Sequence, residues 1–133
     1  MRISICGSMS FAKEMIEAKK DLEGKGHTVT VPADADKYAA GEKTAETKWE
    51  KIEEDVIRNY FKKIKQSDAV LILNKDKNNI INYVGGNALI EMAFAYVLKK
   101  KIFLLNPVPK MHYSDEIEAM QPMIINNDLS KIQ

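Results

Sequence analysis

Three short apolar runs restrict the fold of this chain more than any other feature of its sequence. They are RISIC at residues 2–6, AVLIL within residues 68–74, and KIFLL at residues 101–105. Each is too short for a buried helix, and the run at 68–74 does not alternate apolar with polar residues. An unbroken apolar run such as the one at 68–74 is typical of a central strand in a parallel sheet covered on both faces.

Segments with helical periodicity separate these runs. A stripe at residues 11, 15, 18 and 22 predicts a first helix that ends near Gly24. A second stripe at residues 49, 52, 56, 60 and 64 predicts a helix over residues 48–66. The apolar segment up to residue 98 predicts a third helix, and a short fourth begins near Ser114. Residues 27–31 and 123–125 predict two more strands, whereas the polar, alanine-rich segment 34–47 predicts a mobile loop.

Alternating strands and helices predict an α/β fold, because right-handed crossovers place helices on both faces of a parallel sheet. We expect a three-layer α/β/α sandwich of the flavodoxin or Rossmann-like type, with five strands in the order 2-1-3-4-5. The 133 residues suit a single domain over residues 1–133. Ligands of such sheets bind beyond the carboxyl ends of the strands where strand order reverses, here between the first and third strands. The expected walls are residues 7–10, Asn74 onward and residues 85–87, with Asn106 as a further candidate.

Composition argues against several classes of function. Twenty basic and nineteen acidic residues leave a net charge of +1, so no broad basic surface for nucleic acid is expected. No long apolar span or basic leader indicates a membrane or secreted protein, and we expect a cytoplasmic one. The lone Cys6 has no internal disulfide partner, and His27 and His112 form no metal-ligand cluster. Neither a GxGxxG nor a GxxxxGK[ST] motif is present.

Glu91 is the one carboxylate in the apolar segment from residue 88 to residue 98. Helical spacing places it on the same stripe as Asn87, one turn from the helix start and near the expected crevice. Burying a carboxylate is costly unless it is paired, hydrogen-bonded or protonated. A capping role fits poorly, since Asn87 as N-cap puts Ile90 at the third helical position and Ala88 has no capping oxygen. A structural ion pair with Arg58 or a lysine, and a functional carboxylate, both remain open.

Two glycine-containing segments flank the same expected crevice. Gly85 and Gly86 precede the third helix, and Gly7-Ser8 follows the first strand. Either pair permits a tight turn. Either pair also lets backbone N–H groups approach a phosphate or a sugar, with help from the positive end of a helix. The residues alone do not decide between these two readings.

Several of these segments together resemble the nucleoside 2-deoxyribosyltransferase superfamily, which includes the 2'-deoxynucleoside 5'-monophosphate N-glycosidases. The resemblance spans residues 2–105 and rests on Cys6-Gly7-Ser8, the run 67–74, EMAFA at 91–95 and the run 101–105. Members carry a nucleophilic glutamate in a segment of the form E-[IL]-G-x-A. The resemblance implies that Glu91 is this nucleophile, with Met92 and Ala95 at the matching apolar and alanine positions.

The sequence departs from the family pattern at three places. Ala93 replaces the glycine, and Gly85 stands where the family often has an acidic or hydroxyl residue. The second carboxylate of the family falls near Tyr60, and the nearest acid upstream is Asp55. A weaker likeness relates GGNALIE, residues 85–91, to the GGxGTxxE segment of cytokinin-activating phosphoribohydrolases.

The leading hypothesis is therefore cleavage or transfer of the N-glycosidic bond of a (deoxy)nucleoside or its 5'-monophosphate, with Glu91 as the nucleophile. Neither a metal nor an organic cofactor is implied, and the apolar third helix suggests a homodimer. The expected substrate contacts are Gly7, Ser8, Gly85, Gly86 and Asn87 for sugar or phosphate, and Asn74 for ribose or base. The alternatives are a non-catalytic nucleotide-binding or sensing domain and a purely structural module. A pocket that exposes Glu91 would argue against the last of these.

Overall fold

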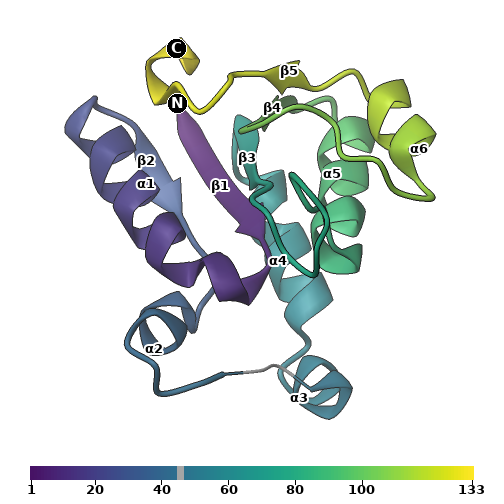
Figure 1. Ribbon diagram of the computed structural model, residues 1–133. Helices are drawn as coiled ribbons and strands as arrows, with labels where there is room; N and C mark the ends of the chain where they lie inside the picture. The colour runs from purple at the N-terminus through teal and green to yellow at the C-terminus, as the bar shows by residue number, and fades with distance from the viewer. Residues whose placement is uncertain (45–46) are drawn as a thin grey trace.

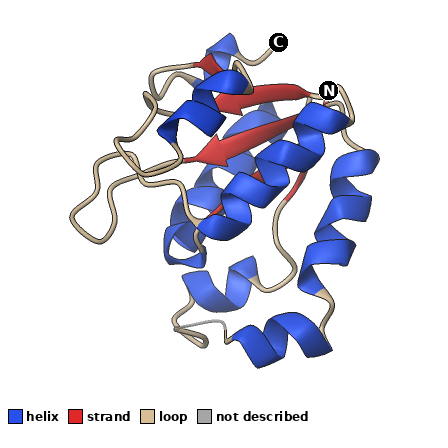
Figure 2. Ribbon diagram, turned by 90° about the vertical axis from the view of Figure 1, so that its right-hand side faces the viewer, coloured by secondary structure: helices blue, strands red, loops and turns tan. Residues whose placement is uncertain are grey.

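The computed structural model describes residues 1–44 and 47–133 and contains one five-stranded parallel sheet (Figures 1 and 2). The strand order is β2-β1-β3-β4-β5, which confirms the predicted order. The strands are β1 (Arg2–Gly7), β2 (Thr28–Thr30), β3 (Ala69–Leu73), β4 (Lys101–Leu104) and β5 (Met123–Ile124). β1 pairs with both β2 and β3, so the chain changes direction across the sheet at β1.

Helices cover both faces of the sheet, so the predicted three-layer α/β/α architecture is confirmed (Figure 1). One face packs against α1, and the other packs against α4, α5 and α6. The α-helices are α1 (Ala12–Gly24), α2 (Ala35–Ala39), α3 (Lys48–Glu53), α4 (Val56–Lys65), α5 (Gly86–Val97) and α6 (Ser114–Ala119). Two 3-10 helices, η1 (Met9–Phe11) and η2 (Leu129–Lys131), complete the described elements.

The central strand β3 explains the unbroken apolar run in the sequence. Every residue of β3 is buried, because its side chains point alternately into the two hydrophobic layers. Ala69, Leu71 and Leu73 pack with α1, whereas Val70 and Ile72 pack with α4 and α5. A strand covered on both sides needs apolar residues at every position, which is why alternation is missing.

The prediction of one continuous helix over residues 48–66 is wrong. This segment is broken into α3 and α4 by Asp55, whose backbone adopts the left-handed conformation with φ 48°. Trp49 and Ile52, predicted to lie on its buried face, are each 65% exposed. Tyr60 and Ile64 are buried as expected because α4 packs on the sheet, whereas α3 lies beyond the carboxyl ends of the strands (Figure 1).

The segment predicted as a loop, residues 34–47, contains the short helix α2, which sequence reasoning missed. Ala35 is buried there, and α2 packs against α1. The Asp34 carboxylate accepts a hydrogen bond of 2.8 Å from Lys43 Nζ, which connects the two ends of the turn around α2. Residues 45 and 46 of the predicted loop lie outside the described residues.

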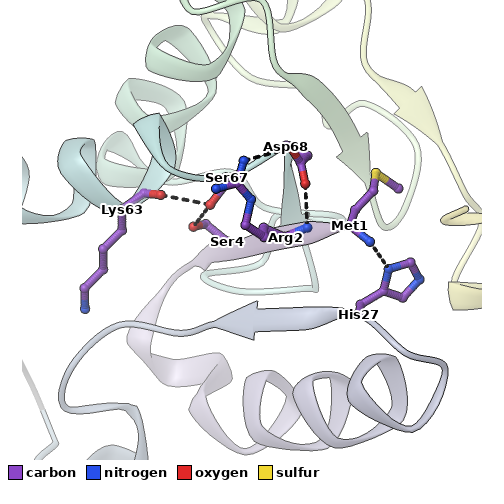
Figure 3. Close-up of polar contacts among 7 residues, drawn as sticks. All are labelled: Met1, Arg2, Ser4, His27, Lys63, Ser67 and Asp68. Carbon is purple, nitrogen blue, oxygen red and sulfur yellow. Dashed lines mark hydrogen bonds and ion pairs between the residues drawn. The ribbon is translucent and has the colours of Figure 1, made fainter.

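Polar contacts join β1 to the neighbouring chain segments at the amino ends of the strands (Figure 3). The backbone N–H of Arg2 donates to the Asp68 carboxylate at 2.8 Å, and the guanidinium of Arg2 adds a contact at 3.2 Å. These bonds lower the pKa of Asp68, the backbone one most. The hydroxyls of Ser4 and Ser67 lie 2.7 Å apart, and the N-terminal amine lies 3.0 Å from His27 Nδ1. They fix the start of β1 against its neighbours.

Candidate active site

A pocket of about 390 Å³ lies at the carboxyl end of β1, where the sheet topology reverses. Its wall comes from the end of β1, from α2, α3 and α4, from the loop between β3 and α5, and from the first turns of α5. Open parallel sheets leave a crevice at this position because successive crossovers leave the sheet in opposite directions. The pocket therefore lies where the strand order predicts a ligand site.

Six of the seven site residues proposed from the sequence line this one pocket. They are Gly7, Ser8, Gly85, Gly86, Asn87 and Glu91. They come from two segments far apart in the chain, which the parallel pairing of β1 with β3 and the crossover into α5 bring together. Asn87 and Glu91 share a face of α5, as their spacing predicts.

Asn74 is the seventh residue, and the structure does not bring it to the pocket. It is fully buried, and its side-chain amide donates to the carbonyl oxygens of Asn106 at 2.9 Å and Pro107 at 3.2 Å. Its side-chain oxygen accepts from the backbone N–H of Asn106 at 2.8 Å. The Asn106 side chain returns a bond of 3.0 Å to the Asn74 carbonyl. These contacts join the loops that follow β3 and β4, so Asn74 has a structural role.

The start of α5 differs from both capping schemes considered for the sequence. The N-cap is Gly85, with extended backbone and no side-chain hydrogen bond to the first turn. Gly86 is thus the first helical residue, and Glu91 lies beyond the turn that a capping box occupies. The first backbone N–H groups of a helix have no partner within it, and here they border the pocket.

Glu91 lines the pocket and is half-buried, less deeply than the apolar sequence around it suggests. The reason is its position in the second turn of α5, on the face that borders the cavity. Arg58, considered as its ion-pair partner, is instead 3.3 Å from the Asp55 carboxylate and has an 81% exposed side chain. Glu91 is therefore accessible from the cavity, which argues against the purely structural module.

Cys6 is fully buried near the end of β1, close enough to Glu91 to interact with it. Burial raises the pKa of the Cys6 thiol well above its usual value, and the negative charge of Glu91 and a hydrogen bond to it raise that pKa further. The thiol donates to the backbone carbonyl of Ser4 at 3.9 Å. A thiol with a raised pKa stays protonated, so it does not compete with Glu91 as a nucleophile.

Tyr60 stands near the position where the family pattern places a second carboxylate, and it lines the pocket. Burial raises the pKa of its phenol well above the usual value, and the neighbouring Cys6 and Glu91 add to this effect. The Tyr60 hydroxyl donates to the backbone carbonyl of Ile5. Asp55 is the nearest acid upstream of Tyr60 in the sequence, and it is not among the described residues that line the pocket. The environment of Glu91 therefore holds a neutral phenol and a neutral thiol.

Lys77 is a pocket residue that sequence reasoning missed. It lies in the loop between β3 and α5, where its ammonium donates to Ser8 Oγ at 2.6 Å and lies 5.6 Å from the centre of the Tyr83 ring. Ser8 Oγ lies 2.8 Å from Ser10 Oγ. Nothing in the sequence distinguishes Lys77 from Lys75 in the same loop. The only available signal was that the loop follows a central strand.

A larger cavity of about 870 Å³ lies beside the amino end of β4, and the residues that line it include Lys99, Lys100 and Lys101. None of the residues proposed for the site contributes to it, so we assign the candidate site to the smaller pocket with Glu91. Among residues 1–44 and 47–133, no group of three His, Cys, Asp or Glu side chains is placed to hold a metal ion. No helix in that part of the chain is long and apolar enough to cross a membrane.

Fold and pocket together define an α/β sandwich with a carboxylate at its topological switch point. A 2-deoxyribosyltransferase from Bacillus psychrosaccharolyticus has a similar structure, with a TM-score of 0.68 and 18% identity over 99% of this chain and 90% of that one. The CMP N-glycosidase BcmB of Clostridium botulinum has a TM-score of 0.54 and 18% identity over 99% of this chain and 98% of its own.

Both likenesses extend over nearly the whole chain, so the fold implied by the resemblance in the sequence is confirmed. No family model matches the sequence, and no curated protein matches it. At this level of identity the structural likeness establishes architecture, and the reactions named are those of the two neighbours.

Proposed function

We propose that this protein breaks, or transfers, the N-glycosidic bond of a nucleoside or a nucleoside 5'-monophosphate. The observation that carries the proposal is the position of Glu91, whose carboxylate borders a pocket of about 390 Å³ at the switch point of the sheet. The substrate classes of the two structural neighbours, a deoxyribosyltransferase and a CMP N-glycosidase, support the same chemistry.

In the proposed reaction a Glu91 oxygen attacks C1' of the sugar. The C1'–N bond breaks as the new C1'–O bond forms, and the departing base takes the electron pair together with a proton from water. Positive charge develops at C1' in the transition state, and a carboxylate held beside that carbon stabilises it. Water then cleaves the glycosyl ester to give the free sugar, or a second base accepts the sugar.

The buried neighbours of Glu91 suit this role. The raised pKa of the Cys6 thiol keeps it protonated, so Glu91 and not Cys6 is the nucleophile of this neighbouring pair. The Tyr60 hydroxyl donates to the carbonyl of Ile5, which fixes the orientation of this polar side chain in the pocket wall. We propose that Gly7, Gly86 and Asn87 contact the sugar from the two sides of the pocket.

The alternative is a nucleotide-binding or sensing domain that does not turn over its ligand. It is favoured by one observation: among the described residues that line the pocket, Glu91 is the only carboxylate. Glycosidases of the two-carboxylate type use a second acid to protonate the leaving group. A binding domain retains affinity for a nucleotide and releases no base.

The test is to incubate the protein with ribo- and deoxynucleosides and their 5'-monophosphates and to measure free base by chromatography. We expect base release that falls at least about 10³-fold in Glu91→Gln, since a nucleophile contributes on this scale. Circular dichroism confirms that the variant is folded. Release that is undiminished in Glu91→Gln refutes the nucleophile, and nucleotide binding without any release supports the binding domain.

We also propose that the protein is a homodimer. The helices α4 and α5 pack together, with the rings of Phe61 and Phe94 4.9 Å apart, and each exposes apolar side chains. Ile57 on α4 is 44% exposed, and Ile90 on α5 is 39% exposed. Light scattering should give about twice the 15.1 kDa chain mass, and Ile57→Lys with Ile90→Lys should reduce it to the monomer value. A wild-type monomer at micromolar concentration contradicts the proposal.

A further inference from the structure

We propose that the pocket selects the 5'-monophosphate over the free nucleoside, and that Lys77 is the residue that makes this selection. The inference rests on the proposed function and names its substrate class. The two structural neighbours do not decide it, because one is described as a 2-deoxyribosyltransferase and the other as a CMP N-glycosidase, at equal identity. Three side chains that line the pocket, those of Lys77, Ser8 and Ser10, have the hydrogen-bonding capacity to make the selection.

Lys77 brings a basic side chain to the wall of the pocket. Its ammonium is half-buried between Ser8 and the face of the Tyr83 ring. Neither contact neutralises it, since a hydroxyl is dipolar and an aromatic face attracts a cation without cancelling its charge. The ion pairs among the described residues do not include Lys77. A cation at the pocket wall without a carboxylate partner favours an anionic ligand.

The hydroxyls of Ser8 and Ser10 extend the hydrogen-bonded chain that begins at Lys77. Ser8 Oγ accepts from Lys77 Nζ at 2.6 Å and from the backbone N–H of Ser10 at 3.3 Å, which uses both of its lone pairs. Its own proton is then directed to Ser10 Oγ at 2.8 Å. The Ser10 hydroxyl keeps its proton for a ligand, and Lys77 keeps two further N–H groups. This chain of three residues therefore offers donors, which suits the acceptor oxygens of a phosphate.

Lys77, Ser8 and Ser10 line the same pocket as Gly85, the N-cap of α5, and as Glu91. Glu91 lies about 9 Å along the helix axis from Gly85, at a rise of about 1.5 Å per residue. Its side chain is tilted toward the helix start. The separation suits a pentose whose C1' meets the carboxylate while its 5' substituent reaches Lys77 and the positive end of α5.

The experiment measures kcat/KM for base release from matched pairs of nucleosides and 5'-monophosphates in the wild type, Lys77→Gln and Lys75→Gln. Lys75→Gln is the matched control, because Lys75 lies in the same loop and carries the same charge but lines a different cavity. We expect the wild type to prefer the monophosphate. Lys77→Gln should lower the ratio of kcat/KM for the monophosphate to kcat/KM for the nucleoside about 10- to 100-fold, the usual effect of a lost charged hydrogen bond.

A binding measurement separates this inference from the proposed function. Calorimetry with ribose 5-phosphate and with ribose needs no catalysis. We expect the phosphate ester to bind, Lys77→Gln to weaken it about 10- to 100-fold, and Lys75→Gln to match the wild type. If no substrate is cleaved while this pattern holds, the proposed reaction fails and the phosphate selection stands. Equal cleavage of nucleosides and monophosphates, unchanged in Lys77→Gln, overturns the selection and leaves the reaction intact.

Discussion

Substituting Asn74 with alanine separates a structural role for this residue from the substrate contact expected from the sequence. The side chain makes three hydrogen bonds in a fully buried position, two to carbonyl oxygens and one from the N–H of Asn106. A net contribution of about 1 kcal/mol for each bond, with some penalty for the groups left unpaired, predicts a loss of about 2–4 kcal/mol. That is a large part of a typical unfolding free energy of about 5–15 kcal/mol.

Urea unfolding followed by circular dichroism measures this loss as a lower midpoint at an unchanged slope. Asn87→Ala is the control, because Asn87 is a pocket residue whose truncation should change the unfolding free energy by less than about 0.5 kcal/mol. Asn74→Ser is a milder truncation if the alanine variant does not fold. The reasoning is refuted if Asn74→Ala unfolds within about 0.5 kcal/mol of the wild type and instead raises KM.

Three further predictions concern residues around the sheet. Because burial and Glu91 raise the pKa of Cys6, its thiol should react slowly with a disulfide reagent at pH 8 in the native protein and rapidly in urea; a fast native reaction contradicts this. Hydrogen bonds from Arg2 lower the pKa of Asp68 in the folded protein. Asp68→Asn should therefore be less stable than the wild type above pH 3.8, and this difference should disappear as the pH falls through the lowered pKa of the folded state. An equal difference in unfolding free energy at pH 2 would argue against this. A Cβ at Gly7 would lie 3.0 Å from a backbone oxygen of β3, whereas a Cβ at Gly86 would meet no atom within 4 Å. Calorimetric melting should therefore show Gly7→Ala destabilised by about 1–3 kcal/mol and Gly86→Ala as stable as the wild type.

The order of the strands was predictable because strands alternate with helices along the chain and the central strand β3 carries an unbroken apolar run. The five residues of β3 are all buried, so no polar interruption obscures the pattern. The break between α3 and α4 was not predictable in the same way. The apolar stripe from Trp49 to Ile64 has helical spacing throughout, and only the left-handed backbone at Asp55 separates the two helices.

The candidate site was predictable where it depends on topology and less so where it depends on side-chain direction. Gly7, Gly85 and Glu91 follow from the rule that ligands bind at the carboxyl ends beside the switch point. Asn74 also follows a central strand, but its amide turns toward the loop after β4 and is used there. Lys77 lies in a loop whose path is set by several asparagines with positive φ, which no periodicity encodes.

The central claim is that the Glu91 carboxylate becomes bonded to C1' of the sugar during the reaction. The most direct measurement is mass spectrometry of the protein quenched with acid during turnover of a cleaved nucleoside or nucleotide, followed by digestion. We predict a glycosyl mass increment on the peptide that contains Glu91, and its absence in Glu91→Gln. Turnover with an increment on another residue, or undiminished turnover in the folded variant, would contradict the claim.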